Sequence, residues 1–172
     1  MAWELDTAHS EVAFAVKHMM ISTVKGKFTS FAASVSLDPK NVTAASVEAS
    51  VDIASIHTGE EQRDGHLKSG DFFDAEQHPK MTFKSTSVKQ SGTDVTIAGD
   101  LTIKGSTKPV TLKGTMEGPA KDPWGNQRVG FSLATEIDRE DFGLTWNQVL
   151  ETGGVLVGKK VKISVEAELI AK

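Results

Sequence analysis

The clearest structural signal in the chain is a segment that reads Asp94-Val-Thr-Ile-Ala-Gly-Asp-Leu-Thr-Ile-Lys-Gly-Ser-Thr-Lys-Pro-Val-Thr-Leu-Lys-Gly-Thr-Met-Glu117. From Val95 to Ile103, and again from Val110 to Met116, apolar or small residues alternate with mostly polar ones. A period of two is typical of a β-strand with one dry face and one wet face. The segment therefore predicts two strands, the second of which starts at Pro109.

Six further segments on either side repeat this alternation. Between residues 24 and 37 its phase changes, because Phe28 and Phe31 cannot share a face of a regular strand, and a β-bulge is the simplest explanation. No linker or internal repeat divides the series, so residues 1–172 are expected to form a single domain. The eight predicted strands cover residues 10–18, 24–37, 45–53, 81–86, 94–104, 109–117, 129–137 and 160–169.

One short helix is predicted between the third and fourth strands. Thr58-Gly-Glu-Glu61 has the spacing of a capping box, in which the threonine hydroxyl and the glutamate carboxylate cap the first turn. Gly70 supplies a stop at the other end. We therefore expect a helix over residues 60–69, with a further turn over residues 71–75.

The composition is that of an ordinary globular protein, and it excludes several function classes. The 172 residues are 38% hydrophobic and 24% charged, with a net charge of −4. A mildly acidic chain with few arginines is a poor partner for nucleic acid. The absence of cysteine removes disulfides and thiolate chemistry. No apolar run approaches the roughly 20 residues that cross a bilayer, so neither a nucleic-acid partner nor an integral membrane span is expected.

The first residues, Met1 to Asp6, contain neither the basic region nor the apolar region of an export signal. The sequence as it stands is therefore expected to act in the cytoplasm. A periplasmic or exported setting is expected instead if a signal has been removed ahead of Met1.

Eight strands that are each apolar on one side either stack as a sandwich or close into a barrel. Because closure removes exposed strand edges, we predict an all-β fold, a single eight-stranded antiparallel barrel with one short helix between strands three and four. Such a barrel is filled by its side chains or holds one slender ligand. A fully packed barrel, in which the inward glycines only permit bends, is the alternative. Small residues expected to point inward and leave space are Ala49, Gly99, Gly114, Thr135 and Ala167.

An apolar slot inside the barrel would suit an acyl or prenyl chain, which binds through burial of apolar surface. Its predicted walls come from the dry faces of the strands, Val161 and Val165 included. The candidate ligand-binding residues are Phe14, Val16, His18, Phe28, Val51, Ile53, Phe83, Ile97, Leu101, Phe131, Leu133, Phe142, Trp146 and Ile163.

Several motifs, in one order along the chain, resemble the YceI-like family. They are Trp3-Glu-Leu-Asp-Thr-Ala-His-Ser10, Gly26-Lys-Phe28, Arg63-Asp-Gly-His-Leu67, Asp71-Phe-Phe-Asp74, His78-Pro79 with Phe83, Gly99-Asp-Leu-Thr-Ile-Lys-Gly105 and Asp138-Arg-Glu-Asp-Phe-Gly-Leu144. The resemblance runs from residue 3 to about residue 170. It implies an extended lipocalin-like barrel that carries a polyisoprenoid, or a similar amphiphilic lipid such as an isoprenoid quinone, in its pore.

The resemblance also implies binding, transport or storage of the lipid rather than catalysis, with no cofactor apart from the bound lipid or quinone. Many relatives are exported, whereas this chain begins without a signal. The chain contains no tyrosine, so a polar contact that a relative makes through a phenol would be missing.

Two groups of ionisable residues leave open an alternative, an enzyme acting on a lipid or small amphiphile. They lie at residues 63–66 and 138–141, and they would make His66 a general base. The structural interpretation makes Arg63 and Arg139 clamps that fix the helix and a loop on the barrel rim. We favour the clamps, because no activated nucleophile or oxyanion-binding loop accompanies them. No catalytic residue is predicted, and no metal site, because the five histidines lack the spacing of a compact zinc site.

Two glycine-containing loops, Gly118–Gln127 and Gly143–Gly158, are expected to govern access to the slot. Trp146 in the second loop either caps the slot or anchors the loop to the barrel. A packed barrel that serves as an interaction module, and a homodimer, remain open from the sequence.

Overall fold

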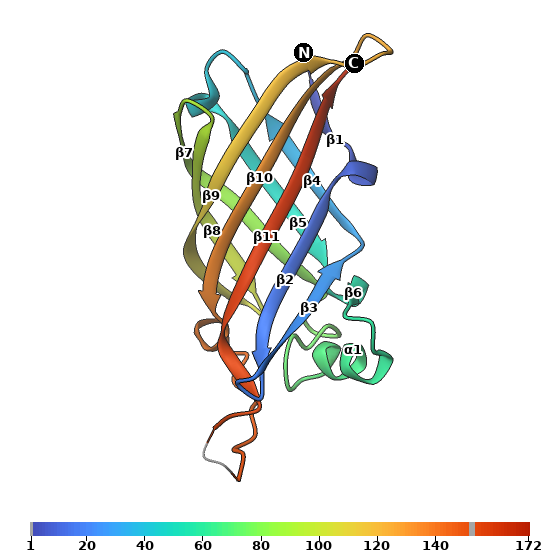
Figure 1. Ribbon diagram of the computed structural model, residues 1–172, viewed down its shortest axis with the longest axis vertical. Coiled ribbons are helices and arrows are strands. Elements are labelled where there is room, and N and C mark those ends of the chain that lie inside the picture. Colours follow the sequence, from blue (N-terminus) through green and yellow to red (C-terminus); the bar gives the residue numbers. More distant parts are fainter. Residues whose placement is uncertain (1, 152–153) are drawn as a thin grey trace.

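The computed structural model describes residues 2–151 and 154–172, and its strands form one antiparallel sheet that closes on itself (Figure 1). The strands are β1 (Trp3–Leu5), β2 (Glu11–His18), β3 (Ser22–Phe28), β4 (Phe31–Ser36), β5 (Ser46–Asp52), β6 (Ile56–His57), β7 (Lys80–Ser91), β8 (Asp94–Ile103), β9 (Ser106–Lys121), β10 (Gln127–Asp138) and β11 (Val157–Ala171). The helices are α1 (Glu61–Lys68) and the short 3₁₀ helices η1 (Thr7–His9), η2 (Val42–Ala44), η3 (Ile53–Ser55) and η4 (Arg139–Phe142).

Strand β11 closes the barrel by pairing with two segments on one of its edges. Its last residues pair with β1, as in Leu5 opposite Leu169, and its earlier residues pair with β2, as in Val16 opposite Val161. β1 continues the sheet into β4. When β1 with β2 and β3 with β4 are each taken as one interrupted strand, and the two-residue β6 is set aside, the barrel has eight strands. The predicted fold class is therefore confirmed.

A single turn of 3₁₀ helix separates β1 from β2. The Asp6 carboxylate accepts a hydrogen bond from the Ala8 N–H at 3.1 Å, and the Ser10 hydroxyl donates to the Asp6 carbonyl at 2.7 Å. The same hydroxyl accepts from the Glu168 N–H at 3.1 Å, which ties the turn to β11. The sequence prediction started its first strand at Ser10 and missed β1, because three residues are too few for an alternation to be recognised.

The change of phase between Phe28 and Phe31 marks an interruption rather than the predicted β-bulge. The Thr29 N–H donates to the Ser55 carbonyl at 3.3 Å, and the Asp52 N–H donates to the Ser30 carbonyl at 2.9 Å. The chain changes partners at this point, since β3 pairs with β2 and β6, whereas β4 pairs with β1 and β5.

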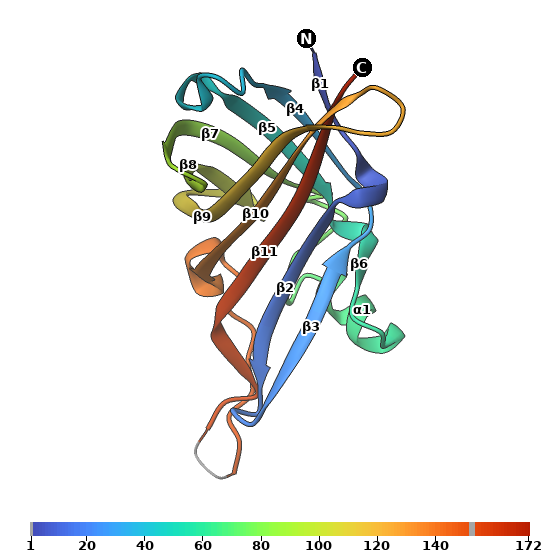
Figure 2. The ribbon, with the colours of Figure 1, turned by 45° about the horizontal axis from the view of Figure 1, so that its top comes forward.

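Helix α1 lies beside one end of the barrel, as Figure 2 shows from a second direction, and differs from its prediction in its cap. Glu60 is the N-cap, and its carboxylate accepts from the N–H groups of Gln62 at 3.1 Å and Arg63 at 2.7 Å. The predicted capping box at Thr58 is therefore wrong. The Thr58 hydroxyl hydrogen-bonds to the side chains of Asp64 and Arg63 instead.

Buried apolar side chains form two clusters inside the barrel. One lies toward α1 and contains Phe28, Ile53 and Phe142, and the other lies toward β1 and contains Val95 and Val129. No helix among the described residues is long and apolar enough to cross a membrane. The candidate site lies between the two clusters, and side chains from both of them line it.

Candidate ligand-binding site

The inside of the barrel contains a pocket with a volume of about 200 Å³. Its walls come mainly from β4, β5 and β7 to β11, and almost all of the lining is apolar. Because strands from all sides contribute, the pocket lies within the barrel and not on its outer face. The candidate residues that line it are Val51, Phe83, Ile97, Leu101, Phe131, Leu133 and Ile163.

A second pocket of about 80 Å³ lies on the side of α1, which contributes Leu67 to its wall. Three side chains, Val12, Met81 and Ile163, line both pockets, so the two adjoin at these residues. The candidate residues that line the second pocket are Phe14, Val16, Phe28, Phe142 and Ile163.

Three candidate residues line neither pocket. His18 is the last residue of β2, and the register between β2 and β11 shifts just before it. Ile53 is buried in the cluster with Phe28, but it belongs to η3, after β5 has ended at Asp52, and it is not in either pocket wall. Trp146 lies outside both walls. His18 and Ile53 were thus predicted by extending a strand alternation to the point where the regular strand ends, and there it no longer places side chains in the pocket wall.

The small inward residues divide into two kinds. Ala49, Thr135 and Ala167 line the larger pocket, as expected of residues that leave space. Gly99 and Gly114 do not line it. A Cβ on Gly99 would lie 2.5 Å from both the Phe83 ring and the Lys84 carbonyl oxygen, so this glycine makes room for an aromatic side chain and for the backbone of β7. A Cβ on Gly114 would overlap the backbone of β10.

Several lining residues were absent from the candidate set. Val110 and Leu112 belong to a dry strand face that the sequence already shows, so that pattern was sufficient to find them. Val42 lies in η2, whose residues carry no periodic signal, and only the fold brings it to the pocket.

Trp146 forms an aromatic cluster with helix α1 and the turn that follows it. Its ring centroid lies 4.7 Å from that of His66 and 5.4 Å from that of Phe72, and the His66 and Phe72 centroids are 5.0 Å apart. The half-buried indole therefore anchors the segment after η4 to α1, which favours the anchoring interpretation over a cap. Residues 152 and 153 of the predicted Gly143–Gly158 loop lie outside the described residues.

His66 is held away from both pockets. Its Nε2 lies 2.9 Å from Asp71 Oδ2, and its ring packs edge-on against Phe72 and Trp146. Neither pocket includes His66 in its wall. The imidazole therefore does not face the space in which a lipid would lie.

Arg139 clamps the chain through backbone oxygens. The buried guanidinium donates from Nη1 to the Leu144 carbonyl at 2.6 Å, from Nε to the Gly158 carbonyl at 2.8 Å and from Nη2 to the Val157 carbonyl at 3.3 Å. Burial lowers the pKa of Arg139 from its usual value. Arg63 acts similarly, donating to the hydroxyl and carbonyl of Thr58 at 2.7 and 2.9 Å. Arg63 therefore ties α1 to the segment just before it, and Arg139 ties η4 to the segments that follow it and to the beginning of β11.

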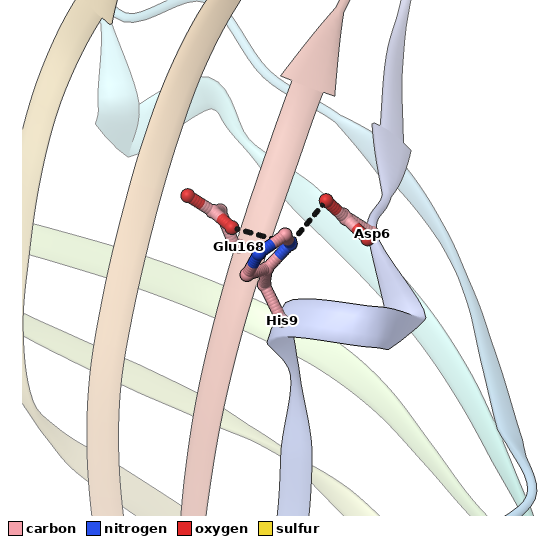
Figure 3. Close-up of side chains that lie close together, drawn as sticks. All are labelled: Asp6, His9 and Glu168. Carbon is pink, nitrogen blue, oxygen red and sulfur yellow. Dashed lines mark hydrogen bonds and ion pairs between the residues drawn. The ribbon is translucent and has the colours of Figure 1, made fainter. Parts of the chain in front are cut away.

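A separate charged cluster lies on the outer wall at the other end of the barrel, where Asp6, His9 and Glu168 meet (Figure 3). His9 Nδ1 lies 2.8 Å from Asp6 Oδ2 and 3.3 Å from Glu168 Oε2. Arg128 Nη1 approaches the same two carboxylates at 2.9 and 3.5 Å, and Arg128 Nε lies 2.8 Å from Asp122 Oδ2. Hydrogen bonds from His9 and Arg128 lower the pKa of Asp6 to about 2.

The three donor groups are of kinds that bind metal ions, but Arg128 already supplies a positive charge between the carboxylates. The cluster therefore works as an ionic network that joins the η1 turn, the beginning of β10 and the end of β11. No sequence pattern predicts the network of Asp6, Arg128 and Glu168, since these residues are distant in the chain.

A closed antiparallel barrel of eight strands with an apolar interior pocket defines the class of lipocalin-like barrels. Residues 3–169 match the family described as the YceI-like domain, and the chain belongs to that family. The family suggested by the sequence motifs is therefore confirmed.

Relatives match this chain over nearly its whole length. A UPF0312 protein of Staphylococcus epidermidis is 40% identical over 167 residues, which cover 96% of this chain and 95% of that protein. A UPF0312 protein of Staphylococcus aureus is 43% identical over 164 residues, which cover 95% and 94%.

Solved structures share the fold. BcnA of Burkholderia cenocepacia has a TM-score of 0.84 and 27% identity, over 98% of this chain and 100% of that one. The YCEI protein of Campylobacter jejuni has a TM-score of 0.78 and 33% identity, over 97% and 96%. A polyisoprenoid binding domain from Saccharophagus degradans has a TM-score of 0.74 over 100% and 99%, and at 15% identity this likeness concerns the fold alone.

Proposed function

We propose that this protein binds a long-chain amphiphilic lipid, of the polyisoprenoid or isoprenoid quinone type, inside the barrel and carries or stores it unchanged. The observation that carries the proposal is the apolar pocket of about 200 Å³ within the closed wall. An interior space lined by apolar side chains does not attract water. Filling it with a hydrocarbon stabilises the complex by about 25 cal/mol per Å² of apolar surface buried.

The arrangement of the two pockets favours a long ligand. They adjoin at Val12, Met81 and Ile163, so a chain too long for the larger pocket would continue past these side chains toward α1. Methionine is flexible and fills irregular space, and a moderate rotation of Met81 would widen the junction. The ligand class that fits is a slender chain with many methylene or isoprene units.

The fold of the polyisoprenoid binding domain from Saccharophagus degradans supports the same ligand class by analogy. A role without catalysis is supported by the wall of the larger pocket, which is almost entirely apolar, and by His66, which packs against aromatic rings away from both pockets. Arg139 lines the second pocket, but its guanidinium is bound to three backbone carbonyls. In this proposal the lipid or quinone is the ligand, and no further cofactor is needed.

The test is lipid extraction from the purified protein with mass spectrometry, followed by titration with a long-chain prenyl lipid. Leu112→Glu places a carboxylate in the wall of the larger pocket, and Thr111→Glu places the same group at the neighbouring exposed position on β9. We expect the first substitution to abolish lipid retention and the second to leave it unchanged. Wild-type protein that carries no hydrophobic molecule and takes up none would contradict the proposal.

A second variant distinguishes loss of lipid binding from loss of folding. Ala49→Phe fills part of the larger pocket with apolar atoms, and Ala49 lies opposite Phe83 in the sheet. Filling the space should lower the affinity for prenyl lipid at least about tenfold while the melting temperature stays within a few degrees of wild type. Unchanged affinity in a folded Ala49→Phe protein would place the ligand elsewhere.

A further inference from the structure

One end of the barrel carries an exposed apolar surface that the lipid-binding proposal does not use. Met19, Met20 and Ile21 form the turn between β2 and β3, and Val149 lies in the hairpin that precedes β11. Their exposed fractions are 41%, 61%, 80% and 78%. We call these four residues the apolar tip. Figure 1 shows that both segments extend beyond the barrel, at the end opposite β1.

The two parts of the apolar tip are held together by the backbone. The Met19 N–H donates to the Leu156 carbonyl at 2.7 Å, and a Cβ on Gly154 would lie 3.4 Å from Met20 Cγ. The hairpin is itself closed by the bridge between Val149 and Val155. The tip is therefore a joint surface of two chain segments.

The β2–β3 turn has a backbone conformation that its residues do not favour. Met19 and Met20 have φ angles of 54° and 64°, and the Ile21 N–H donates to the His18 carbonyl at 3.2 Å. Positive φ at both central positions is the signature of a type I′ turn, which strongly prefers Asn-Gly. Folding alone would therefore select small or polar residues here. Two methionines in left-handed conformation indicate a role for their side chains outside the folded core.

Exposed lysines flank the apolar tip on the outer face of the barrel. Lys25 on β3 and Lys162 on β11 lie in register on either side of Ala15, and Lys17 lies one step nearer the tip. The three lysines form what we call the basic band. Among the described residues none of the three takes part in an ion pair.

The basic band lies close enough to the tip to act together with it. Lys17 is two residues before Met19 and Lys25 four residues after Ile21, which at about 3.3 Å per residue in a strand is roughly 7 and 13 Å. Electrostatic attraction to an anionic surface acts over a Debye length of about 8–10 Å at physiological ionic strength. With the tip inserted about 5–10 Å into the interface, Lys25 would lie roughly 3–8 Å from the membrane surface, which is within that length.

We propose that the apolar tip and the basic band dock this protein onto a bilayer that contains anionic lipids. Apolar side chains on a protruding turn enter the interface between head groups and acyl chains, and the lysines behind them attract the negative surface. A protein partner fits less well, because a stable interface buries about 800 Å² on each side, and a protrusion with four exposed apolar side chains offers too little area.

The position of the tip connects it to the interior. Val16 and Val157 line the second pocket. Val16 is three residues before Met19 of the tip, and Val157 directly follows Leu156, whose carbonyl accepts from the Met19 N–H. If the proposed function holds, a lipid taken from the bilayer would reach the barrel at this end. The docking itself does not depend on the identity of the bound lipid, so the following test stands apart from the lipid-extraction test.

The experiment is flotation of the full-length protein with vesicles of phosphatidylglycerol and phosphatidylcholine in equal parts, compared with vesicles of phosphatidylcholine alone. We expect the protein to float with the anionic vesicles and to bind the neutral ones at least about tenfold more weakly. Ile21→Asp should weaken binding to the anionic vesicles more than tenfold. The matched control is Trp124→Asp, since Trp124 is 80% exposed in the turn between β9 and β10 at the other end of the barrel. This control should bind as wild type does.

A further variant separates docking from folding. Met20→Gly suits the positive φ of the turn, so its melting temperature should equal or exceed that of wild type. Its binding to anionic vesicles should nevertheless fall about tenfold, because an apolar side chain is lost. The proposal is overturned if wild type does not float, if Trp124→Asp weakens binding as much as Ile21→Asp, or if Ile21→Asp dissociates a dimer while vesicle binding persists.

Discussion

Gly114 of β9 lies so close to β10 that no larger residue fits there. A Cβ at this position would overlap the Ser132 carbonyl oxygen and would lie 2.9 Å from Leu133 Cα. Because both neighbours are backbone atoms of a paired strand, they cannot move without breaking the ladder between β9 and β10. This glycine therefore serves a close approach of two strands, whereas the sequence pattern alone assigned it to empty space.

We expect Gly114→Ala to lower the free energy of unfolding by about 3 kcal/mol, as overpacking against rigid surroundings does. Gly130→Ala, on the facing strand, is the control, since its added Cβ would meet no atom within 4 Å. Urea denaturation of the two variants measures the difference. Equal stability of Gly114→Ala and Gly130→Ala would show that the strands can separate at little cost.

The carboxyl group of Asp6 makes the stability of the fold depend on pH in the acid range. Hydrogen bonds from His9 and Arg128 lower its pKa from 3.8 to about 2 in the folded protein. A carboxyl group whose pKa is lowered by folding stabilises the native state above its unfolded pKa, and this contribution is lost as the pH falls toward the folded pKa. The contribution of Asp6 is therefore complete near pH 6 and disappears between about pH 4 and pH 2.

We expect Asp6→Asn to reduce the free energy of unfolding by about 1 kcal/mol at pH 6, since solvent screens the partly exposed network, and by much less at pH 2. Denaturant unfolding of the variant and of wild type at both pH values tests this. A loss of the same size at both would mean that the aspartate acts through its hydrogen-bonding geometry and not through its charge.

At the scale of single elements, the sequence predicted the strands well because burial on one face imposes a period of two. β8 shows this most clearly, since its inward residues from Val95 to Ile103 are all buried or lie against the Phe83 ring. The extent of β7 was underestimated, because the register with β8 shifts between Ser85 and Ser87 and the alternation changes phase there. The helix was found but not its cap, since the Glu60 carboxylate takes the amides that Thr58 was expected to cap.

The candidate residues divide in the same way between the middle of regular strands and the ends of strands. Phe131 and Leu133 line the pocket because they lie in the middle of a long regular strand. Ile53 and His18 do not, because they lie where strands end and the backbone turns. Val42 was not predicted, because its position depends on how η2 folds over the barrel. Sequence periodicity predicts which residues face inward, whereas strand ends and loops depend on tertiary contacts.

The segment after η4 provides a prediction at this scale. Trp146 packs on His66 and Phe72, so Trp146→Ala should lower the free energy of unfolding by about 2 kcal/mol. Affinity for a long-chain prenyl lipid should not change, because the indole lines neither pocket. Trp124→Ala removes an exposed indole and should alter stability by less than about 0.5 kcal/mol. A Trp146→Ala protein of normal stability but weaker lipid binding would support the cap interpretation instead.

For the whole molecule, the interior consists of two adjoining pockets, so the length of a bound chain determines whether it occupies one pocket or both. Met81 is buried and lines both pockets, so its side chain lies at the junction that a long chain has to pass. A prenyl chain short enough for the larger pocket alone does not need the junction. Chain length therefore decides whether a change at Met81 affects binding.

We expect Met81→Phe, which puts a stiff ring at the junction, to weaken binding of a long polyprenyl lipid about tenfold or more and to leave a short prenyl alcohol nearly unaffected. Met81→Leu keeps the volume and the apolar character and should bind both lipids as wild type does. Competition titrations with the two chain lengths measure the ratio directly. If Met81→Phe weakened both lipids equally, the chain would not run from one pocket to the other, and the second pocket would serve only the packing around α1.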